Sequence, residues 1–296
     1  MAWLRACPAL ICLVFVPAVS FGQDKFVDSN GVSIRYVERG TGEAVVLLHG
    51  VGGSLDTWTL TGRFQELAAD YRVIAFDARG HGKSGKPHDP KQYGREMGLD
   101  VIRLLDHLGI TRAHIVGYSM GGMITSQLLT LHPERFLTAT LVAGAGRFAW
   151  TAEQEQGSEQ EALERERECI SRTLIYRLAP LNEPKPTEDD IKARSAACLA
   201  DSTQDRFAVA ALTRARRDQV ISRAQVAAVH VPTLGVVGNL DTNEAGLQEL
   251  KKMRPDVKLV VVDGATHGGD RGVLRRSEFM AALREFLATH RQLPSQ

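Results

Sequence analysis

GYSMGG, residues 117–122, lies between an apolar run that ends at Val116 and a helix-like run that begins at Met123. The spacing Gly-x-Ser-x-Gly at such a junction predicts a sharp turn from a strand into a helix. The glycines two positions before and after Ser119 leave space for this turn, because a side chain there would clash. The pattern favours a strained Ser119 at the end of a strand, and a plain glycine-rich turn is the alternative.

Strands and helices alternate along most of the remaining chain. Two short strands are expected on either side of Asn30-Gly31, a typical hairpin turn. Apolar runs typical of buried strands in a parallel sheet lie at 43–50, 71–77, 113–117, 136–144, 232–238 and 257–263. Helical periodicity follows at 55–69, 93–108, 123–131, 244–253 and 272–290. This order predicts an α/β protein with a doubly wound, mostly parallel sheet.

The alternation is interrupted once, by residues 147–230, which contain helical segments and no convincing strand. Thr187, followed by Asp190 three positions later, is a capping-box start for one of these helices. We therefore expect a helical cap at 147–230, inserted between the two parts of a core domain at 23–146 and 231–296.

Residues 1–22 resemble a secretory signal peptide. Arg5 precedes an apolar stretch from Ala6 to Val19, and small residues follow at Ser20 and Gly22, which is the order of a cleavable signal. The stretch is short for a membrane span of ~20 residues, and an uncleaved anchor is the alternative. We expect a secreted or periplasmic protein that keeps no stable membrane anchor after cleavage.

Charge and cysteine content restrict the partners and the compartment. The 296 residues carry a formal net charge of +1, which falls to about zero when Arg5 is removed with the signal. Without a strongly basic face, nucleic acid is not an expected partner, whereas a small-molecule substrate is. Cys169 and Cys198 would remain in the mature chain as either a disulfide or two buried thiols, and both readings stay open.

A nucleophilic serine needs a general base, and the base needs a carboxylate that orients it. In a doubly wound sheet such groups gather beyond the carboxyl ends of the strands. His267, in the loop GATHGG, directly follows the last strand, whereas His290 at the end of the last helix is expected at the surface. Asp241, in GNLD, follows the preceding strand and is the expected acid, with Asp263 as the runner-up.

Two backbone amides are candidates for an oxyanion hole, the site that stabilises a tetrahedral intermediate. The N–H of Met120 follows Ser119 at the start of a helix, and the N–H of Val51 lies in the loop HGVGG after an apolar strand. His49 is expected to brace this loop by hydrogen bonds rather than to act in catalysis. These groups require no metal or organic cofactor, and the sequence has no zinc-type His/Cys spacing.

HGVGG, DARGHGKS, GYSMGG, GNLD and ATHGG resemble, in their order and spacing, the α/β-hydrolase superfamily and specifically its cap-bearing members. These include carboxylesterases, enol-lactone hydrolases, C–C bond hydrolases, cofactor-free haloperoxidases and epoxide hydrolases. The resemblance covers the chain from about Phe26 to the last helix, apart from the cap. It implies that Arg79, His81 and Ser84 belong to a structural loop near the site.

Two details of the sequence restrict the resemblance. Epoxide hydrolases and haloalkane dehalogenases have Asp as the nucleophile, so Ser119 disfavours both activities. After His267 the family often has a Pro-containing, acidic helix start, and here the sequence is GGDRGVLRR. That departure leaves the local geometry of the histidine loop open.

The resemblance implies a serine hydrolase that cleaves a small carboxylic ester through an acyl-enzyme. His267 would accept the proton of Ser119, and Asp241 would orient His267. Hydrolysis of a lactone or a C–C bond, or cofactor-free haloperoxidase activity, would use the same triad. A non-catalytic small-molecule binding protein with the same fold is the alternative from another class.

The cap is expected to cover the pocket and to select the substrate. Its apolar side chains face either the substrate or the interior of the cap, and the candidates are Phe148, Trp150, Ile175 and Tyr176. The sequence assigns none of them to substrate binding.

Overall fold

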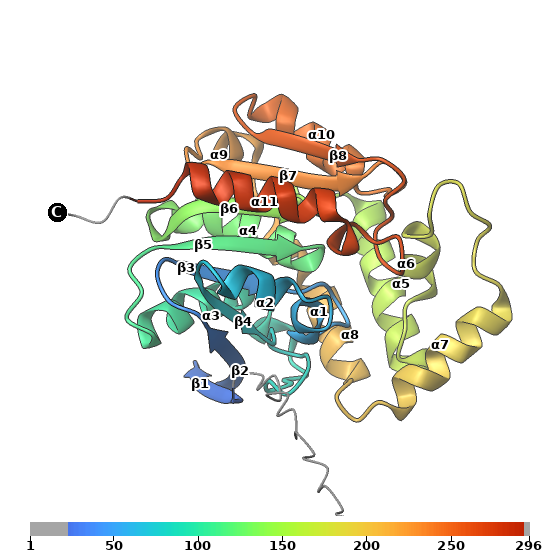
Figure 1. Cartoon of the computed structure of the whole chain (residues 1–296). Helices are drawn as coiled ribbons and strands as arrows, with labels where there is room; N and C mark the ends of the chain where they lie inside the picture. Colours follow the sequence, from blue (N-terminus) through green and yellow to red (C-terminus); the bar gives the residue numbers. More distant parts are fainter. Residues whose placement is uncertain (1–22, 293–296) are drawn as a thin grey trace, which may run out of the picture.

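The computed structural model describes residues 23–292, so the predicted signal peptide at 1–22 lies outside the described residues. A sheet of eight strands crosses the molecule in the order β1-β2-β4-β3-β5-β6-β7-β8 (Figure 1). β1 (Lys25–Ser29) and β2 (Val32–Arg39) form an antiparallel hairpin, β2 pairs antiparallel with β4, and all other neighbours are parallel. The predicted doubly wound, mostly parallel sheet is confirmed.

The parallel strands lie within two residues of the ends expected from the apolar runs. They are β3 (Ala44–Leu48), β4 (Arg72–Phe76), β5 (Ala113–Tyr118), β6 (Phe136–Val142), β7 (Thr233–Gly238) and β8 (Lys258–Val262). In β3, Val46 and Leu48 pack on one face of the sheet, and Val45 and Leu47 pack on the other. Both faces are covered, which explains why these strands are apolar throughout rather than alternating.

Helices cover the two faces of the sheet. α3 (Arg95–His107), α4 (Met120–Leu131) and α10 (Glu244–Met253) pack on the face of Val46, and α2 (Arg63–Ala68) and α11 (Ser277–Thr289) pack on the opposite face. Figure 1 shows α2 and α11 in front of the sheet.

Two helix predictions need correction. The single helix expected at 55–69 is divided into α1 (Asp56–Thr59) and α2, because Gly62 between them has a φ of +78°. The last helix was expected from about residue 272, but α11 begins at Ser277 after a 3-10 turn (Val273–Arg275).

Between β6 and β7 the chain forms helices and no named strand. These helices are α5 (Ala152–Glu168), α6 (Arg172–Arg177), α7 (Glu188–Ala200), α8 (Arg206–Arg214), the 3-10 helix η3 (Ala215–Gln219) and α9 (Arg223–Ala227). Figure 1 shows α5, α6 and α7 beyond the carboxyl ends of the central strands. The capping box predicted at Thr187 and Asp190 is confirmed at the start of α7.

A disulfide joins the end of α5 to α7. Cys169 and Cys198 are bonded, with their Cα atoms 5.8 Å apart, which answers the question that the sequence left open. The cross-link ties together two helices that pack away from the sheet.

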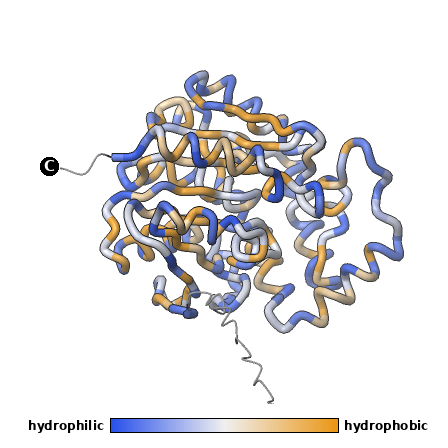
Figure 2. Tube along the Cα trace, in the orientation of Figure 1, coloured by the Kyte–Doolittle hydropathy of each residue, from blue (hydrophilic) through white to orange (hydrophobic). Residues whose placement is uncertain are grey.

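Hydropathy follows this arrangement. Figure 2 shows hydrophobic residues along β7 and β8 and mostly hydrophilic residues on the outer loop that leads to α7. Among residues 23–292, none of the helices combines the length and the continuous apolar character of a membrane span.

Candidate active site

Ser119 occupies a strained turn between β5 and α4. Its backbone angles are φ +54° and ψ −111°, a conformation that non-glycine residues rarely adopt. A Cβ on Gly117 would lie 2.2 Å from the carbonyl oxygen of Gly121, and a Cβ on Gly121 would lie 2.5 Å from that of Leu48. The predicted strand-turn-helix and its need for two glycines are confirmed.

The structure brings Ser119, His267 and Asp241 together at the carboxyl edge of the sheet. Nε2 of His267 lies 3.0 Å from Oγ of Ser119, and Nδ1 lies 2.8 Å from Oδ2 of Asp241. With Nδ1–H donating to the carboxylate, Nε2 is unprotonated and can accept the serine proton. The arrangement has the geometry of a nucleophile, a general base and an orienting acid.

Asp241 is held in place by its neighbours. It is 1% exposed, and its second oxygen accepts the backbone N–H of Asn243 at 2.9 Å. The Nδ2 group of Asn243 donates to the carbonyl oxygen of Ala143 (2.8 Å) and lies 3.5 Å from Nδ1 of His267. Asn243 was not singled out in the sequence, and only its position two residues after Asp241 could have drawn attention to it.

The alternative acid and the alternative histidine lie elsewhere. Oδ1 of Asp263 accepts a hydrogen bond from Nδ2 of Asn239 at 2.7 Å, and Nδ1 of His290 donates to the carbonyl oxygen of Phe286 at 2.8 Å. Within residues 23–292, neither side chain has a hydrogen bond to Ser119 or His267.

The two candidate oxyanion donors lie beside Ser119. Val51 and Met120 both line a pocket that reaches the serine. Among the hydrogen bonds of residues 23–292, none has the backbone N–H of Val51 or Met120 as its donor. The N–H of Gly121 donates to the carbonyl oxygen of His49 at 3.1 Å, which ties the loop of Val51 to the turn of Met120. Both N–H groups are therefore available to a ligand.

His49 braces the loop HGVGG, as expected. Its Nε2 accepts the backbone N–H of Ala78 (3.0 Å), so Nδ1 carries the proton and donates to the carbonyl oxygen of Gly50 (2.7 Å). Burial lowers the pKa of His49, which keeps the ring neutral.

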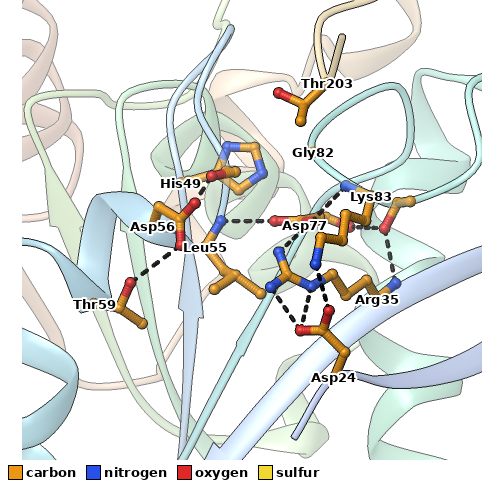
Figure 3. A network of polar contacts seen from close by, with 12 residues as sticks. Asp24, Arg35, His49, Leu55, Asp56, Thr59, Asp77, Gly82, Lys83 and Thr203 are labelled. Carbon is orange, nitrogen blue, oxygen red and sulfur yellow. Dashed lines mark hydrogen bonds and ion pairs between the residues drawn. The ribbon is translucent and has the colours of Figure 1, made fainter. Parts of the chain in front are cut away.

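Asp77 connects the loops beneath the site (Figure 3). Its carboxylate accepts the backbone N–H groups of Leu55 (2.7 Å) and Lys83 (2.8 Å) and pairs with Arg35 at 3.1 Å. Arg35 and Lys83 also pair with Asp24. A fully buried carboxylate thus joins β2 to the loops that follow β3 and β4.

The three residues predicted for a structural loop are buried and do not line the pocket at Ser119. The Arg79 guanidinium binds both oxygens of Asp100 at 2.7 and 2.5 Å. Oγ of Ser84 donates to the backbone oxygen of Asp77 at 2.6 Å. Nδ1 of His81 lies 3.1 Å from the backbone oxygen of Arg79.

The pocket at Ser119 is small, with a volume of about 30 Å³. Besides Ser119, Val51 and Met120, its lining consists of Met123, Arg147, Leu174, Arg177, Leu178, Leu212, Arg216, Gln219 and Asn243. Phe148, Trp150, Ile175 and Tyr176, for which the sequence left substrate contact and the cap interior both open, do not line this pocket. Ile175 and Tyr176 lie in α6, whose Leu174 and Arg177 line the pocket instead, because one step along a helix turns a side chain by about 100°.

Phe148 lies away from the pocket at Ser119. With Ile221 and Leu250 it lines a second cavity and packs against the hydrophobic cluster between α10 and the sheet. Elsewhere in residues 23–292, no three His, Cys, Asp or Glu side chains gather in a way that could hold a metal ion.

Comparisons with known proteins agree with this geometry. Residues 43–168 match the family model described as the alpha/beta hydrolase fold. The dihydrolipoyllysine-residue acetyltransferase component of the acetoin cleaving system of Cupriavidus necator is 40% identical over 126 residues, which cover 41% of this chain and 32% of that protein. The chain therefore spans about a third of the length of this relative.

Two further similarities extend over most of the chain. A putative 2-succinyl-6-hydroxy-2,4-cyclohexadiene-1-carboxylate synthase of Bacillus subtilis is 26% identical over 253 residues, covering 81% of this chain and 89% of that protein. The solved structure of an N-acyl homoserine lactone degrading enzyme superposes with a TM-score of 0.70 and 28% identity, covering 88% of this chain and 100% of that one. With the eight-stranded sheet and the turn at Ser119, these matches show that the chain has the α/β-hydrolase fold.

Proposed function

We propose that this protein is a serine hydrolase that cleaves a small carboxylic ester through an acyl-enzyme. The observation that carries the proposal is the position of His267, whose two ring nitrogens lie within hydrogen-bond distance of Ser119 and Asp241. This is the arrangement that activates a serine hydroxyl.

In the proposed first half-reaction, Oγ of Ser119 attacks the ester carbonyl while Nε2 of His267 takes its proton. The buried Asp241 carboxylate stabilises the imidazolium that forms. The negative oxygen of the tetrahedral intermediate accepts the N–H groups of Val51 and Met120, and donors aimed at this oxygen supply much of the rate enhancement. His267 then gives the proton to the departing alcohol.

In the second half-reaction, water attacks the acyl group on Ser119. His267 accepts a proton from this water and returns it to Oγ of Ser119 as the carboxylic acid leaves. No group other than water and the ester is consumed, and the residues end in their starting protonation states.

A lactone is the second candidate substrate. The 28% identical neighbour is described as an N-acyl homoserine lactone degrading enzyme. A lactone is an internal ester, so the same attack by Ser119 opens its ring. Ester and lactone therefore belong in one substrate panel.

The Cys169–Cys198 disulfide supports a secreted or periplasmic location, because disulfides persist in oxidising compartments. We propose that residues 1–22 direct the chain there and are removed. Sequencing the N-terminus of the protein recovered from the envelope or the medium tests this, and a start at Met1 would contradict it.

Treatment with a fluorophosphonate tests the nucleophile directly. The wild-type protein is compared with Ser119→Ala and with Ser126→Ala. Ser126 is buried in α4, the helix that follows Ser119, and does not line the pocket. We expect an adduct on Ser119 in the wild type and in Ser126→Ala and none in Ser119→Ala, located by peptide mass spectrometry. A folded wild type that forms no adduct and turns over no ester or lactone would favour a binding protein.

A further inference from the structure

Three arginines line the pocket at Ser119, and no Asp or Glu does. They come from three separate segments: Arg147 follows β6, Arg177 is the last residue of α6, and Arg216 lies in η3. The backbone carbonyl of Arg147 accepts the N–H of Ile221 at 2.9 Å, which places the first segment beside the third. The convergence is therefore part of the packing among the segments between β6 and β7.

Nearby carboxylates partly offset these charges. Glu161 of α5 lies 2.7 Å from Arg216 and 4.0 Å from Arg177. Arg165, one turn further along α5, is also buried, and its charge acts on Arg216 and Glu161. Glu164 also acts on Arg165, and Asp241 acts on Arg177. Four guanidinium groups thus face three carboxylates, which leaves an excess of one positive charge near Ser119.

The guanidinium of Arg147 has no anionic partner within the described residues. Its Nε is buried and forms no hydrogen bond there, and its one aromatic neighbour, the Trp150 ring, lies 5.9 Å away. Burial and the charges of Arg216 and Arg177 lower the pKa of Arg147 to about 9, so the group remains charged at neutral pH. An unpaired charge in such a place is costly unless a ligand completes it.

The remaining lining is mostly apolar, with Met123, Leu174, Leu178 and Leu212 beside the polar Gln219 and Asn243. A guanidinium offers a planar pair of donors that matches the two oxygens of a carboxylate.

We propose that the substrate is a small ester or lactone with a second, free carboxylate, and that Arg147, Arg177 and Arg216 bind this carboxylate while Ser119 attacks the ester carbonyl. The inference rests on the proposed function, because it identifies the substrate class of the same site. It predicts that half-esters of short dicarboxylic acids are better substrates than the neutral diesters.

The first experiment measures binding without turnover. Monoethyl adipate and diethyl adipate are titrated into Ser119→Ala by calorimetry, with ethyl butyrate as a neutral reference. We expect saturable binding of monoethyl adipate that weakens at high salt, since screening reduces the attraction between charges, and at least about tenfold weaker binding of both neutral esters. Equal affinity for charged and neutral esters would overturn the proposal.

The second experiment measures the ratio of kcat/KM for monoethyl adipate to that for diethyl adipate. We expect Arg147→Gln and Arg177→Gln each to lower this ratio about tenfold to a hundredfold, the loss typical of a hydrogen bond to a charged group. Arg217→Gln is the matched control: it neighbours Arg216 in η3, its side chain is 71% exposed, and it does not line the pocket. A ratio that none of the pocket variants changes would contradict the inference.

A second variant and a competing anion distinguish failure of the carboxylate site from failure of folding or of the proposed hydrolase activity. The side chain of Arg177 is 45% exposed, so Arg177→Gln remains informative if Arg147→Gln does not fold. Inorganic phosphate is compared with acetate as a competitor, and stronger inhibition by phosphate would overturn the choice of a carboxylate. If monoethyl adipate binds to Ser119→Ala but the wild type does not hydrolyse it, the result would contradict the proposed hydrolase activity and would still support the binding of its carboxylate by the arginines.

Discussion

The hydroxyl of Tyr118 donates a hydrogen bond to the backbone carbonyl oxygen of His267 at 2.7 Å. The two rings also stack, with centroids 5.4 Å apart and planes inclined by 30°. Tyr118 is the last residue of β5 and directly precedes Ser119. The strand that carries the serine therefore also fixes the loop that carries the histidine.

Tyr118→Phe is expected to lower kcat about three- to tenfold and to leave KM within about twofold. The ring stays stacked, but the loop loses a hydrogen bond worth ~1 kcal/mol, and His267 is then less well aligned with Ser119. Steady-state kinetics and thermal unfolding are measured together. Tyr93→Phe is the control, because its hydroxyl bonds the carbonyl oxygen of Pro87 away from the triad. A Tyr118→Phe enzyme with unchanged kcat would show that the contact does not position the base.

Asp241→Asn is expected to reduce kcat about 10³- to 10⁴-fold with little change in KM, because an amide cannot hold His267 in the reactive tautomer. Asp263→Asn is the matched control, since that carboxylate follows the neighbouring strand and bonds Asn239 instead. Steady-state kinetics on one ester tests both variants. Equal losses for the two variants would refute the assignment of Asp241 as the orienting acid.

Gly82→Ala is expected to destabilise the fold by at least ~3 kcal/mol. Gly82 has a φ of +52°, and a Cβ there would lie 2.2 Å from Oδ2 of Asp77, the carboxylate that joins the loops in Figure 3. Gly31→Ala is the control that distinguishes backbone strain from a steric clash, because Gly31 has a φ of +78° with open space around it. That control is expected to lose only ~1 kcal/mol. Urea unfolding measures both variants, and equal losses would exclude the steric explanation.

Buried His81 is expected to make the fold sensitive to acid. Burial and the nearby charges of Arg165 and Lys86 lower its pKa to about 3, against ~6.5 in an unfolded chain. Between these values the unfolded state binds more protons, so stability is complete above pH ~6.5 and falls as the pH decreases through this window.

The contribution of His81 to this loss is ~2 kcal/mol between pH 7 and pH 5. Denaturant unfolding of His81→Gln at both pH values is expected to show a correspondingly smaller loss than the wild type. His230→Gln, at an exposed position, serves as the control and should behave as the wild type does. Parallel pH dependence in all three proteins would exclude His81 as the cause.

Removal of the disulfide is expected to destabilise the helices between β6 and β7. The bond closes a loop of 29 residues, for which chain-entropy estimates give ~3–4 kcal/mol. A double variant, Cys169→Ser with Cys198→Ser, is compared with the wild type by denaturant unfolding and hydrogen exchange. Faster exchange is expected in α5 and α7 and not in the sheet. Unchanged exchange in these helices would show that packing alone holds them.

Local sequence patterns were sufficient to predict the alternation of strands and helices and the three side chains that meet at the carboxyl edge of the sheet, Ser119, His267 and Asp241. Each of these features depends on residues close together in the chain: a glycine pair around Ser119, an apolar run before Asp241, and an apolar run before His267. Parallel strands end at one edge of a sheet, so residues that directly follow them are brought together without further information.

Only the tertiary structure decided what surrounds the triad. Gly62 interrupts a periodic pattern that would otherwise continue as one helix, and Tyr118 reaches His267 across 149 positions. Cys169 and Cys198 could be paired only once α5 and α7 were placed side by side.

The residues that line the pocket at Ser119 could not be predicted from the sequence. Arg147, Arg177 and Arg216 share no motif and lie on segments whose sequences indicate helices or a loop and nothing more. A helix pattern fixes the backbone locally, but which of its side chains faces a pocket depends on how the helix is rotated against its neighbours. The sequence alone therefore determined the sheet, the strained serine and the residues at its carboxyl edge, whereas tertiary packing decided that three arginines line the pocket at Ser119.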